Sequence, residues 1–145
     1  MKGWTEDATE HEYDAAGVFL DLLLPKEVTA ATLSLLRRAP IEHRQAKDLL
    51  RASGLDALPV DNPKVAAKLR KLESGKRLAP VLLVRGNLLH GSHLIIADGF
   101  HRICAGMALK PGTLIPCKLV DLPVERAVST VSGGTSKGRL STARQ

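Results

Sequence analysis

The transition from an apolar run to a helical pattern at residues 94–109, LIIADGFHRICAGMAL, constrains the fold of this 145-residue chain more than any other feature. Residues 94–96 form a short apolar run of the kind that buried strands use. The apolar residues that follow have helical spacing and share one face: Phe100, Ile103, Cys104, Met107 and Ala108. We predict a strand that leads directly into a helix through a turn at residues 97–99.

The predicted turn has the features of an anion-binding helix start. Asp98 is expected to cap the helix by accepting a hydrogen bond from a free amide, and Gly99 lets the backbone leave the strand sharply. Unpaired N–H groups and the positive end of the helix dipole attract anions, phosphate above all. His101 and Arg102 are expected to point away from the apolar face and to add positive charge. A purely structural turn with a solvated His-Arg pair is the alternative.

The segment of residues 79–121 resembles the core of the ParB/sulfiredoxin superfamily. A proline precedes an apolar strand, a second strand ends in a glycine-arginine motif at a helix start, and a closing strand follows a turn that contains glycine. The motif is Gly-Glu-Arg-Arg in ParB-like proteins, where it binds nucleotide phosphates, and Gly99 and Arg102 match it. It is Gly-Gly-Cys-His-Arg in sulfiredoxins, and Gly99, His101 and Arg102 match that form. Phe100 stands at the position of the reactive sulfiredoxin cysteine.

The resemblance implies a nucleotide-binding protein, or a nucleotide-dependent enzyme, whose ligand phosphates lie at the turn of residues 98–102. The implied ligand-binding residues are Gly99, Phe100, His101 and Arg102. A nucleoside triphosphate and Mg²⁺ are the implied cofactors, and a divalent cation would offset repulsion between phosphate and the Asp98 carboxylate. Lys76 and Arg77 lead into the next strand of a compact sheet, so we expect them to add cations to the same turn.

Two other functions fit the same residues. In a DNA-binding or nuclease module, Asp98 would hold a divalent metal ion and His101 would act as the general base. Lys64, Lys68 and Lys71 would then contact nucleic acid, although a solvated helix surface is the commoner meaning of such a run. In a non-enzymatic interaction protein the motif would survive only as a helix cap. No helix-turn-helix pattern follows the core, so DNA reading of the ParB partition type is not expected.

The net charge of +6 and the pI of about 9.6 favour anionic partners. We expect a nucleotide as partner, with DNA as the alternative, and we leave a homodimer open. Only one Trp, one Tyr and two Phe are present, so the predicted core is aliphatic and base stacking on aromatic side chains is not expected. The chain has no signal-peptide pattern, and its apolar run at residues 18–24 is far shorter than the ~20 residues of a membrane span. We therefore expect a cytoplasmic protein without a membrane partner.

No disulfide framework, thiol catalysis or histidine-bound metal is expected. Cys104 lies on the apolar helix face and Cys117 in a predicted strand, so both are predicted as small buried residues. A reactive cysteine needs exposure and a stabilised thiolate. His90 and His93 are predicted as exposed loop residues that do not converge with His101 on a metal ion.

Residues 1–39 are predicted as a helical extension packed on the core, and residues 1–10 of it as polar and loose. Helices are predicted over residues 12–24 and 25–38 and meet at Pro25. The apolar stripes are Ala15, Ala16, Phe19, Leu22 and Leu23 in the first helix and Val28, Ala31, Leu35 and Leu36 in the second. We expect both stripes to be buried, with a partner-binding extension as the alternative.

Residues 40–124 are predicted as the core domain, of class α/β (α+β), with a small mixed sheet and flanking helices. Strands are predicted at residues 41–46, 81–84, 94–96 and 114–120. Pro116 places the last strand at a sheet edge. Further helices are predicted at residues 47–52 and from Pro63, after Asp61 or Asn62 as cap, with a buried face of Val65, Leu69 and Leu72. Residues 125–145 are basic and rich in Ser, Thr and Gly, and are predicted as a disordered tail.

Overall fold

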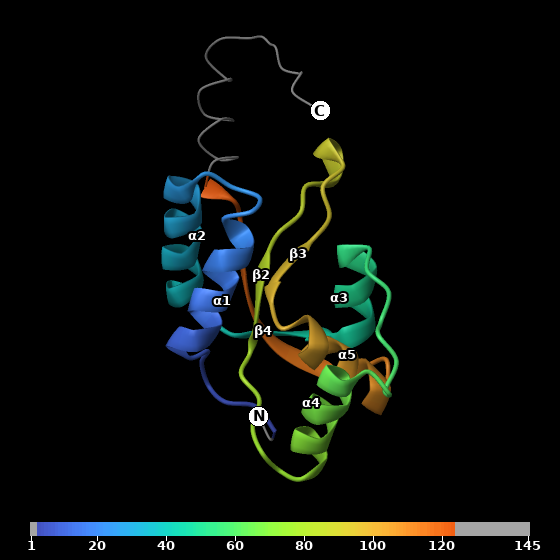
Figure 1. The fold of residues 1–145 in the computed structure, drawn as a ribbon. Helices are drawn as coiled ribbons and strands as arrows, with labels where there is room; N and C mark the ends of the chain where they lie inside the picture. Colours follow the sequence, from blue (N-terminus) through green and yellow to red (C-terminus); the bar gives the residue numbers. More distant parts are fainter. Residues whose placement is uncertain (1–2, 124–145) are drawn as a thin grey trace, which may run out of the picture.

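The structure, a computed structural model, describes residues 3–123 and confirms the α/β class (Figure 1). Its mixed sheet has the strand order β1-β4-β2-β3. The strands are β1 (Glu42–Gln45), β2 (Val81–Val84), β3 (Ile95–Asp98) and β4 (Leu114–Val120). The helices are α1 (Glu10–Leu20), α2 (Lys26–Arg38), α3 (Ala46–Ser53), α4 (Pro63–Glu73) and α5 (Phe100–Leu109), with the short 3-10 helix η1 (Leu88–His90) between β2 and β3. Figure 1 shows α1 and α2 on one side of the sheet and α3, α4 and α5 on the other.

β4 lies inside the sheet, so the edge position predicted from Pro116 is wrong. β4 runs antiparallel to β1 and parallel to β2, and β3 is antiparallel to β2. Pro116 lies opposite His43 of β1, whereas the pairs with β2 begin one residue later, at Cys117 and Val81. Because Pro116 precedes the ladder to β2, an interior strand tolerates it.

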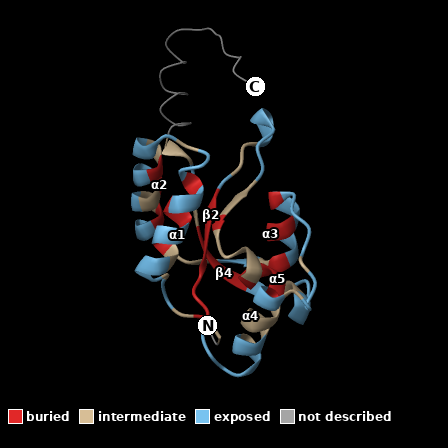
Figure 2. Ribbon diagram, in the orientation of Figure 1, coloured by how far each residue is buried: buried red, intermediate tan, exposed pale blue. Residues whose placement is uncertain are grey.

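The apolar run of β2 is buried on both faces because its side chains alternate between two cores. Val81 and Leu83 pack into a core with α3 and α5, and Leu82 and Val84 pack into a core with α1 and α2. Figure 2 shows buried residues in the sheet and on the helix faces turned toward it. One strand therefore supports both helical layers.

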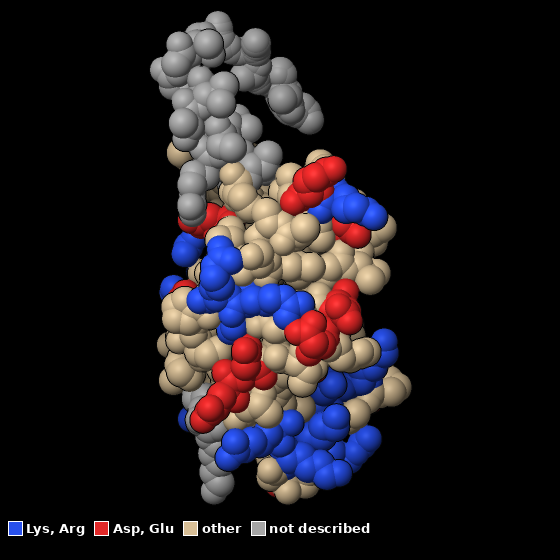
Figure 3. All heavy atoms as spheres, turned by 90° about the vertical axis from the view of Figure 1, so that its left-hand side faces the viewer, with Lys and Arg blue, Asp and Glu red and all other residues tan. Residues whose placement is uncertain are grey.

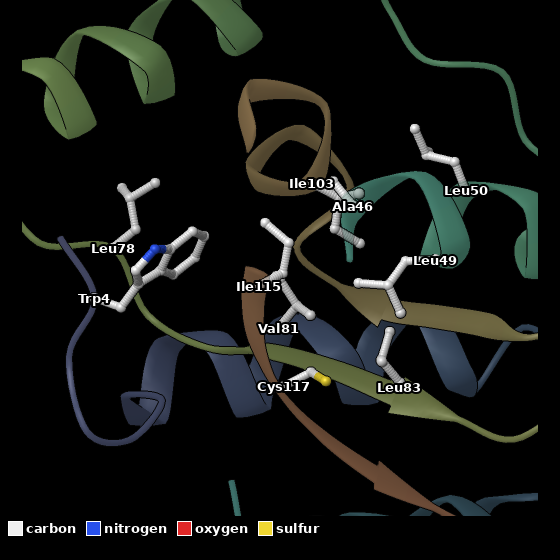
Figure 4. Packing of buried hydrophobic residues seen from close by; sticks show 10 residues of the cluster. All are labelled: Trp4, Ala46, Leu49, Leu50, Leu78, Val81, Leu83, Ile103, Ile115 and Cys117. Carbon is white, nitrogen blue, oxygen red and sulfur yellow. The ribbon is translucent and has the colours of Figure 1, made fainter. Parts of the chain in front are cut away.

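The first described residues pack against the core, so the prediction that residues 1–10 are loose is wrong for residues 3–10. The Trp4 side chain is buried beside Leu78 (Figure 4). The Thr5 amide donates to the Leu78 carbonyl at 2.7 Å, and the Leu78 amide donates to the Gly3 carbonyl at 2.9 Å. An indole buries a large apolar area, so one Trp anchors a segment whose other residues are mainly polar.

The helical hairpin is present, but its buried faces differ from the predicted stripes. Only Ala16 and Leu36 of those stripes are buried. Leu22 and Leu23 are exposed because α1 ends at Leu20. The buried faces are Tyr13, Ala16, Gly17 and Leu20 in α1 and Thr29, Thr32 and Leu36 in α2. Close packing of helices favours small residues at the contact, and apolar spacing alone does not reveal which face that is.

The start of α4 follows the prediction. The Asn62 side chain accepts hydrogen bonds from the amides of Lys64 at 3.0 Å and Val65 at 3.2 Å. Val65 is buried, and Leu69 and Leu72 pack around it in a cluster that includes residues of α5. This packing fixes the lysine side of α4 relative to the turn that starts α5.

None of the helices within residues 3–123 combines the length and the apolar character that crossing a membrane requires. The predicted tail at residues 125–145 lies outside the described residues.

Candidate functional site

A pocket of about 530 Å³ opens beside the end of β3, between helices of the two layers. Its walls come from α1, α4, the segment before β2 and the turn between β3 and α5. The lining residues are His11, Glu12, Ala15, Lys64, Ala67, Lys68, Lys71, Arg77, Leu78, Ala79, Asp98, Gly99, His101 and Arg102. The turn predicted as a phosphate site thus shares a pocket with the lysines that the sequence assigns to a nucleic-acid surface.

Gly99 forms the turn between β3 and α5, and only glycine fits there. Its φ is +115°, a value that side chains disfavour, and a Cβ would lie 2.4 Å from Cγ1 of Val81. The prediction that Asp98 caps the helix is wrong, because Asp98 is the last residue of β3 and Gly99 is the N-cap. Since no side chain at the cap accepts from α5, its first amides are left for water or a ligand.

Arg102 is buried, contrary to the prediction that it points away from the apolar face. Its side chain is 7% exposed. Nη1 donates to the carbonyls of Ala79 at 2.6 Å and Pro80 at 3.2 Å, and Nη2 donates to the Asp98 carboxylate. Arg102 therefore joins the segment before β2, the end of β3 and the first turn of α5, and it shapes the pocket while its terminal nitrogens are held by protein acceptors.

Asp98, which is half-buried, forms the other half of this ion pair. Burial raises the pKa of Asp98, and the positive charges of Arg102 and Lys68 offset part of the rise. The sequence predicts Asp98 as a catalytic or metal-binding carboxylate, and the structure places it in the pocket wall against Arg102. Within residues 3–123, His, Cys, Asp and Glu form no group of three or more that could hold a metal ion.

Four basic side chains line the pocket without an ion pair or hydrogen bond to any described residue: Lys64, Lys68, Lys71 and Arg77. We call these residues the pocket cations. The three lysines have the spacing i, i+4 and i+7, so they share one side of α4. Burial lowers the pKa of Lys68, the charges of Lys71 and Arg102 lower it further, and those of Asp98 and Glu12 offset part of the fall. The pocket therefore concentrates positive charge that no ion pair with a described residue neutralises.

The basic surface continues outside the pocket. Figure 3, which views the molecule from the α1 and α2 side, shows Lys and Arg side chains gathered at the lower end, at the height of α4 in Figure 1. Lys76, predicted to join the phosphate turn, is exposed and does not line the pocket. Its neighbour Arg77 does line it.

His101 and Phe100 are neighbours with different surroundings. His101 lines the pocket, where burial and the charges of Lys64 and Lys68 lower its pKa, so the ring is neutral near pH 7. Phe100 packs against the hydrophobic clusters around α5 and does not line the pocket. The two rings form a T-shaped pair with 5.6 Å between their centroids. Of the two, only His101 reaches a ligand in the pocket.

α1 supplies a wall of the pocket that sequence reasoning missed. His11 and Glu12 lie there. The Glu12 carboxylate accepts hydrogen bonds from the Thr9 amide at 2.6 Å and from the Thr9 hydroxyl. Burial raises the pKa of Glu12, but the bonds from Thr9 outweigh it and the pKa is lowered, so the carboxylate is ionised near neutral pH. The Thr-x-x-Glu spacing identifies a capping box in the sequence, but it does not indicate what faces it.

Lys118 is, after Arg102, the second buried basic residue, and the sequence analysis did not single it out. Its side chain is 5% exposed and lies 3.0 Å from the Asp7 carboxylate. Nζ donates to the Tyr13 hydroxyl at 2.9 Å and to the Arg37 carbonyl at 3.0 Å. Burial lowers the pKa of Lys118, but its bonds to Tyr13 and Asp7 outweigh that effect and raise it. This network ties α1 and α2 to β4 and so supports the α1 wall; a lysine within an otherwise apolar strand was the available signal.

Cys104 and Cys117 are buried, as predicted. Burial raises the pKa of Cys104 and raises that of Cys117 to about 11. His90 and His93 are exposed, as predicted. None of these four residues lines the pocket.

Comparisons of this chain with protein-family models, with curated proteins and with solved structures found no match. The resemblance to the ParB/sulfiredoxin superfamily therefore stays a prediction.

Proposed function

We propose that this protein binds the phosphate groups of a nucleotide in the pocket between α1 and α4, as a ParB/sulfiredoxin-like protein without the sulfiredoxin cysteine. The proposal is carried by one observation: the pocket cations, which form no ion pair with a described residue, line the same pocket as the glycine turn at the start of α5. Cations that lack protein partners and free helix amides are the two features that phosphate sites combine.

The carboxylates of the pocket do not cancel this charge. The negative charge of Asp98 would repel a phosphate group. Arg102 forms an ion pair with Asp98, and its positive charge offsets this repulsion at close range. Glu12 accepts its hydrogen bonds from Thr9, and one carboxylate stands against four pocket cations. The pocket volume of about 530 Å³ is in the usual range for small-molecule sites. A triphosphate would carry Mg²⁺ on its own oxygens, as nucleotide sites commonly have it.

Calorimetric titration with nucleoside triphosphates, each with and without Mg²⁺, tests this proposal. Lys68→Ala and Arg77→Ala should each weaken binding about tenfold, because each removes a charge-assisted hydrogen bond of about 1.5 kcal/mol or more. Lys47→Ala is the matched control, since it removes the same charge from an exposed position on α3. Absence of nucleotide binding, or equal weakening in the control, would contradict the proposal.

Contact with the DNA backbone is a second candidate, favoured by the exposure of Lys64 and Lys71 on α4. DNA held by phosphate contacts alone should lose affinity steeply as salt is raised and should ignore sequence. Nucleotide binding in the pocket should be less sensitive to salt, because hydrogen bonds from the backbone N–H groups of the first turn of α5 contribute to its affinity. Titration of duplex DNA and of a nucleotide at two salt concentrations separates the two. A non-enzymatic interaction protein is the conclusion if neither ligand binds.

A further inference from the structure

We infer that the pocket recognises a phosphate chain and not the base attached to it, so that inorganic triphosphate binds as tightly as a nucleoside triphosphate. This inference rests on the proposed function and names the part of the ligand that the pocket recognises. It follows from the kinds of hydrogen-bonding groups and aromatic rings in the pocket that a ligand can contact.

The open side-chain groups in the pocket are mainly positive. The pocket cations have no partner among the described residues, whereas Asp98 is paired with Arg102 and Glu12 with Thr9. Ammonium and guanidinium groups donate hydrogen bonds and accept none. Reading a base edge requires a fixed pattern of donors and acceptors, which such a set does not provide.

Some backbone groups of the pocket already have hydrogen-bond partners within the protein. The Leu78 amide and carbonyl bond to Gly3 and Thr5 respectively. The Ala79 carbonyl accepts from Arg102. The first amides of α5 remain open, and these favour an anion.

The pocket offers little ring surface for stacking. None of its described lining residues is Phe, Tyr or Trp, and the apolar ones are Ala15, Ala67, Leu78 and Ala79. Phe100 lies between the lining residues Gly99 and His101 in the sequence, but its side chain is packed against the core. The ring of His101 contacts the ring of Phe100. His11 is the other ring in the lining, at an exposed position. Aromatic side chains can stack on any of the bases. Because the pocket has few exposed rings, we expect the affinity to come from contacts with the phosphates.

The spacing of the lysines suits an extended chain of charges. Lys64 and Lys71 are seven residues apart on α4, a separation of about 10 Å along the helix axis at about 1.5 Å per residue. Lys68 lies between them, and Arg77 approaches from the segment before β2. Successive phosphates can therefore each meet a cation.

Calorimetric titration of the full chain tests this inference with orthophosphate, pyrophosphate, inorganic triphosphate, the four ribonucleoside triphosphates and free nucleosides. We expect the five triphosphates to agree within about threefold, pyrophosphate to bind about tenfold more weakly than triphosphate, and free nucleosides not to bind, since each charge-assisted contact is worth about one factor of ten. A preference above about tenfold for one base, or inorganic triphosphate more than about tenfold weaker than every nucleotide, would overturn the inference while leaving the proposed function intact. If no phosphate compound binds, both fail.

Single-residue variants also separate recognition of the phosphate chain from recognition of the base. Lys68→Ala should weaken inorganic triphosphate and ATP by the same factor, and Lys47→Ala should change neither. His11→Ala should affect both ligands equally, because His11 is not expected to stack on a base. A loss of ATP affinity in His11→Ala with triphosphate unchanged would reveal base stacking and would overturn the inference.

Discussion

The molecule has two sets of basic residues that differ in what surrounds them. Arg102 and Lys118 are buried and each makes several hydrogen bonds to protein acceptors. The pocket cations are less buried and make none to the described residues. The first set connects elements: Arg102 joins the segment before β2 to β3 and α5, and Lys118 joins β4 to α1 and α2.

These surroundings decide which charges are available to a ligand. A buried charge is tolerated only when protein groups replace the water it has lost, so its hydrogen bonds are already used. A charge that keeps contact with water can exchange that water for an anion. Deletion of a residue from the first set should therefore cost stability, and deletion from the second should cost binding.

The largest expected effect is on stability, in Arg102→Ala. The change leaves the half-buried Asp98 carboxylate without its partner and two buried carbonyls without a donor, so the free energy of unfolding should fall by about 3–5 kcal/mol. Chemical denaturation measures this loss. Arg85→Ala is the control, because Arg85 pairs with Asp121 at an exposed position and should cost about 1 kcal/mol or less. Equal losses of stability in the two variants would contradict the distinction between structural cations and cations available to a ligand. Because Arg102→Ala is expected to destabilise the fold, it is not a test of ligand binding.

A smaller loss is expected in Lys118→Ala. The Tyr13 hydroxyl and the Arg37 carbonyl lose the donor that Lys118 supplies. The Asp7 side chain is 58% exposed and keeps its hydrogen bonds from the Tyr13 hydroxyl at 2.9 Å and the Ala8 amide at 2.7 Å. The free energy of unfolding should fall by about 1–3 kcal/mol, the cost of unsatisfied buried polar groups. Lys118→Met keeps the apolar stem and separates lost packing from lost hydrogen bonds. A Lys118→Ala variant as stable as the wild type would show that the network does not hold α1 and α2.

Lys68→Gln should leave the free energy of unfolding within about 0.5 kcal/mol of the wild type, or raise it slightly. Burial and the neighbouring charges lower the pKa of Lys68, which means that the folded protein disfavours its ammonium form. Removing the charge therefore relieves repulsion instead of breaking a contact. The measurement is chemical denaturation without ligand, and a loss above about 1 kcal/mol would place Lys68 among the structural residues.

The smallest effect concerns pH and His101. The pKa of His101 is lowered from its ordinary value of 6.5, so the unfolded chain takes up a proton at higher pH than the folded protein does. The contribution of His101 to stability is present above pH 6.5 and is lost as the pH falls through the lower folded value. His101→Gln should make the fall in melting temperature between about pH 7.5 and about pH 5 shallower. An unchanged slope would contradict this.

The local structure around α4 and α5 could be predicted from the amino-acid sequence. The strand before Gly99, the turn that only glycine can make and the helix after it follow from apolar spacing and backbone geometry within a few residues. The start of α4 at Asn62 follows from a side chain that caps nearby amides. These features are readable because the interacting groups are neighbours in the chain.

Tertiary structure alone decided which charges are buried and what faces the turn. Arg102 and Lys68 are both basic residues on helices, yet Arg102 meets carbonyls from the segment before β2 while Lys68 lines an open wall. The contribution of Glu12 to the pocket also depends on how α1 lies against β3. Burial and pairing depend on elements that are distant in sequence, and a linear pattern records the polarity of a position without recording the group that will stand opposite it.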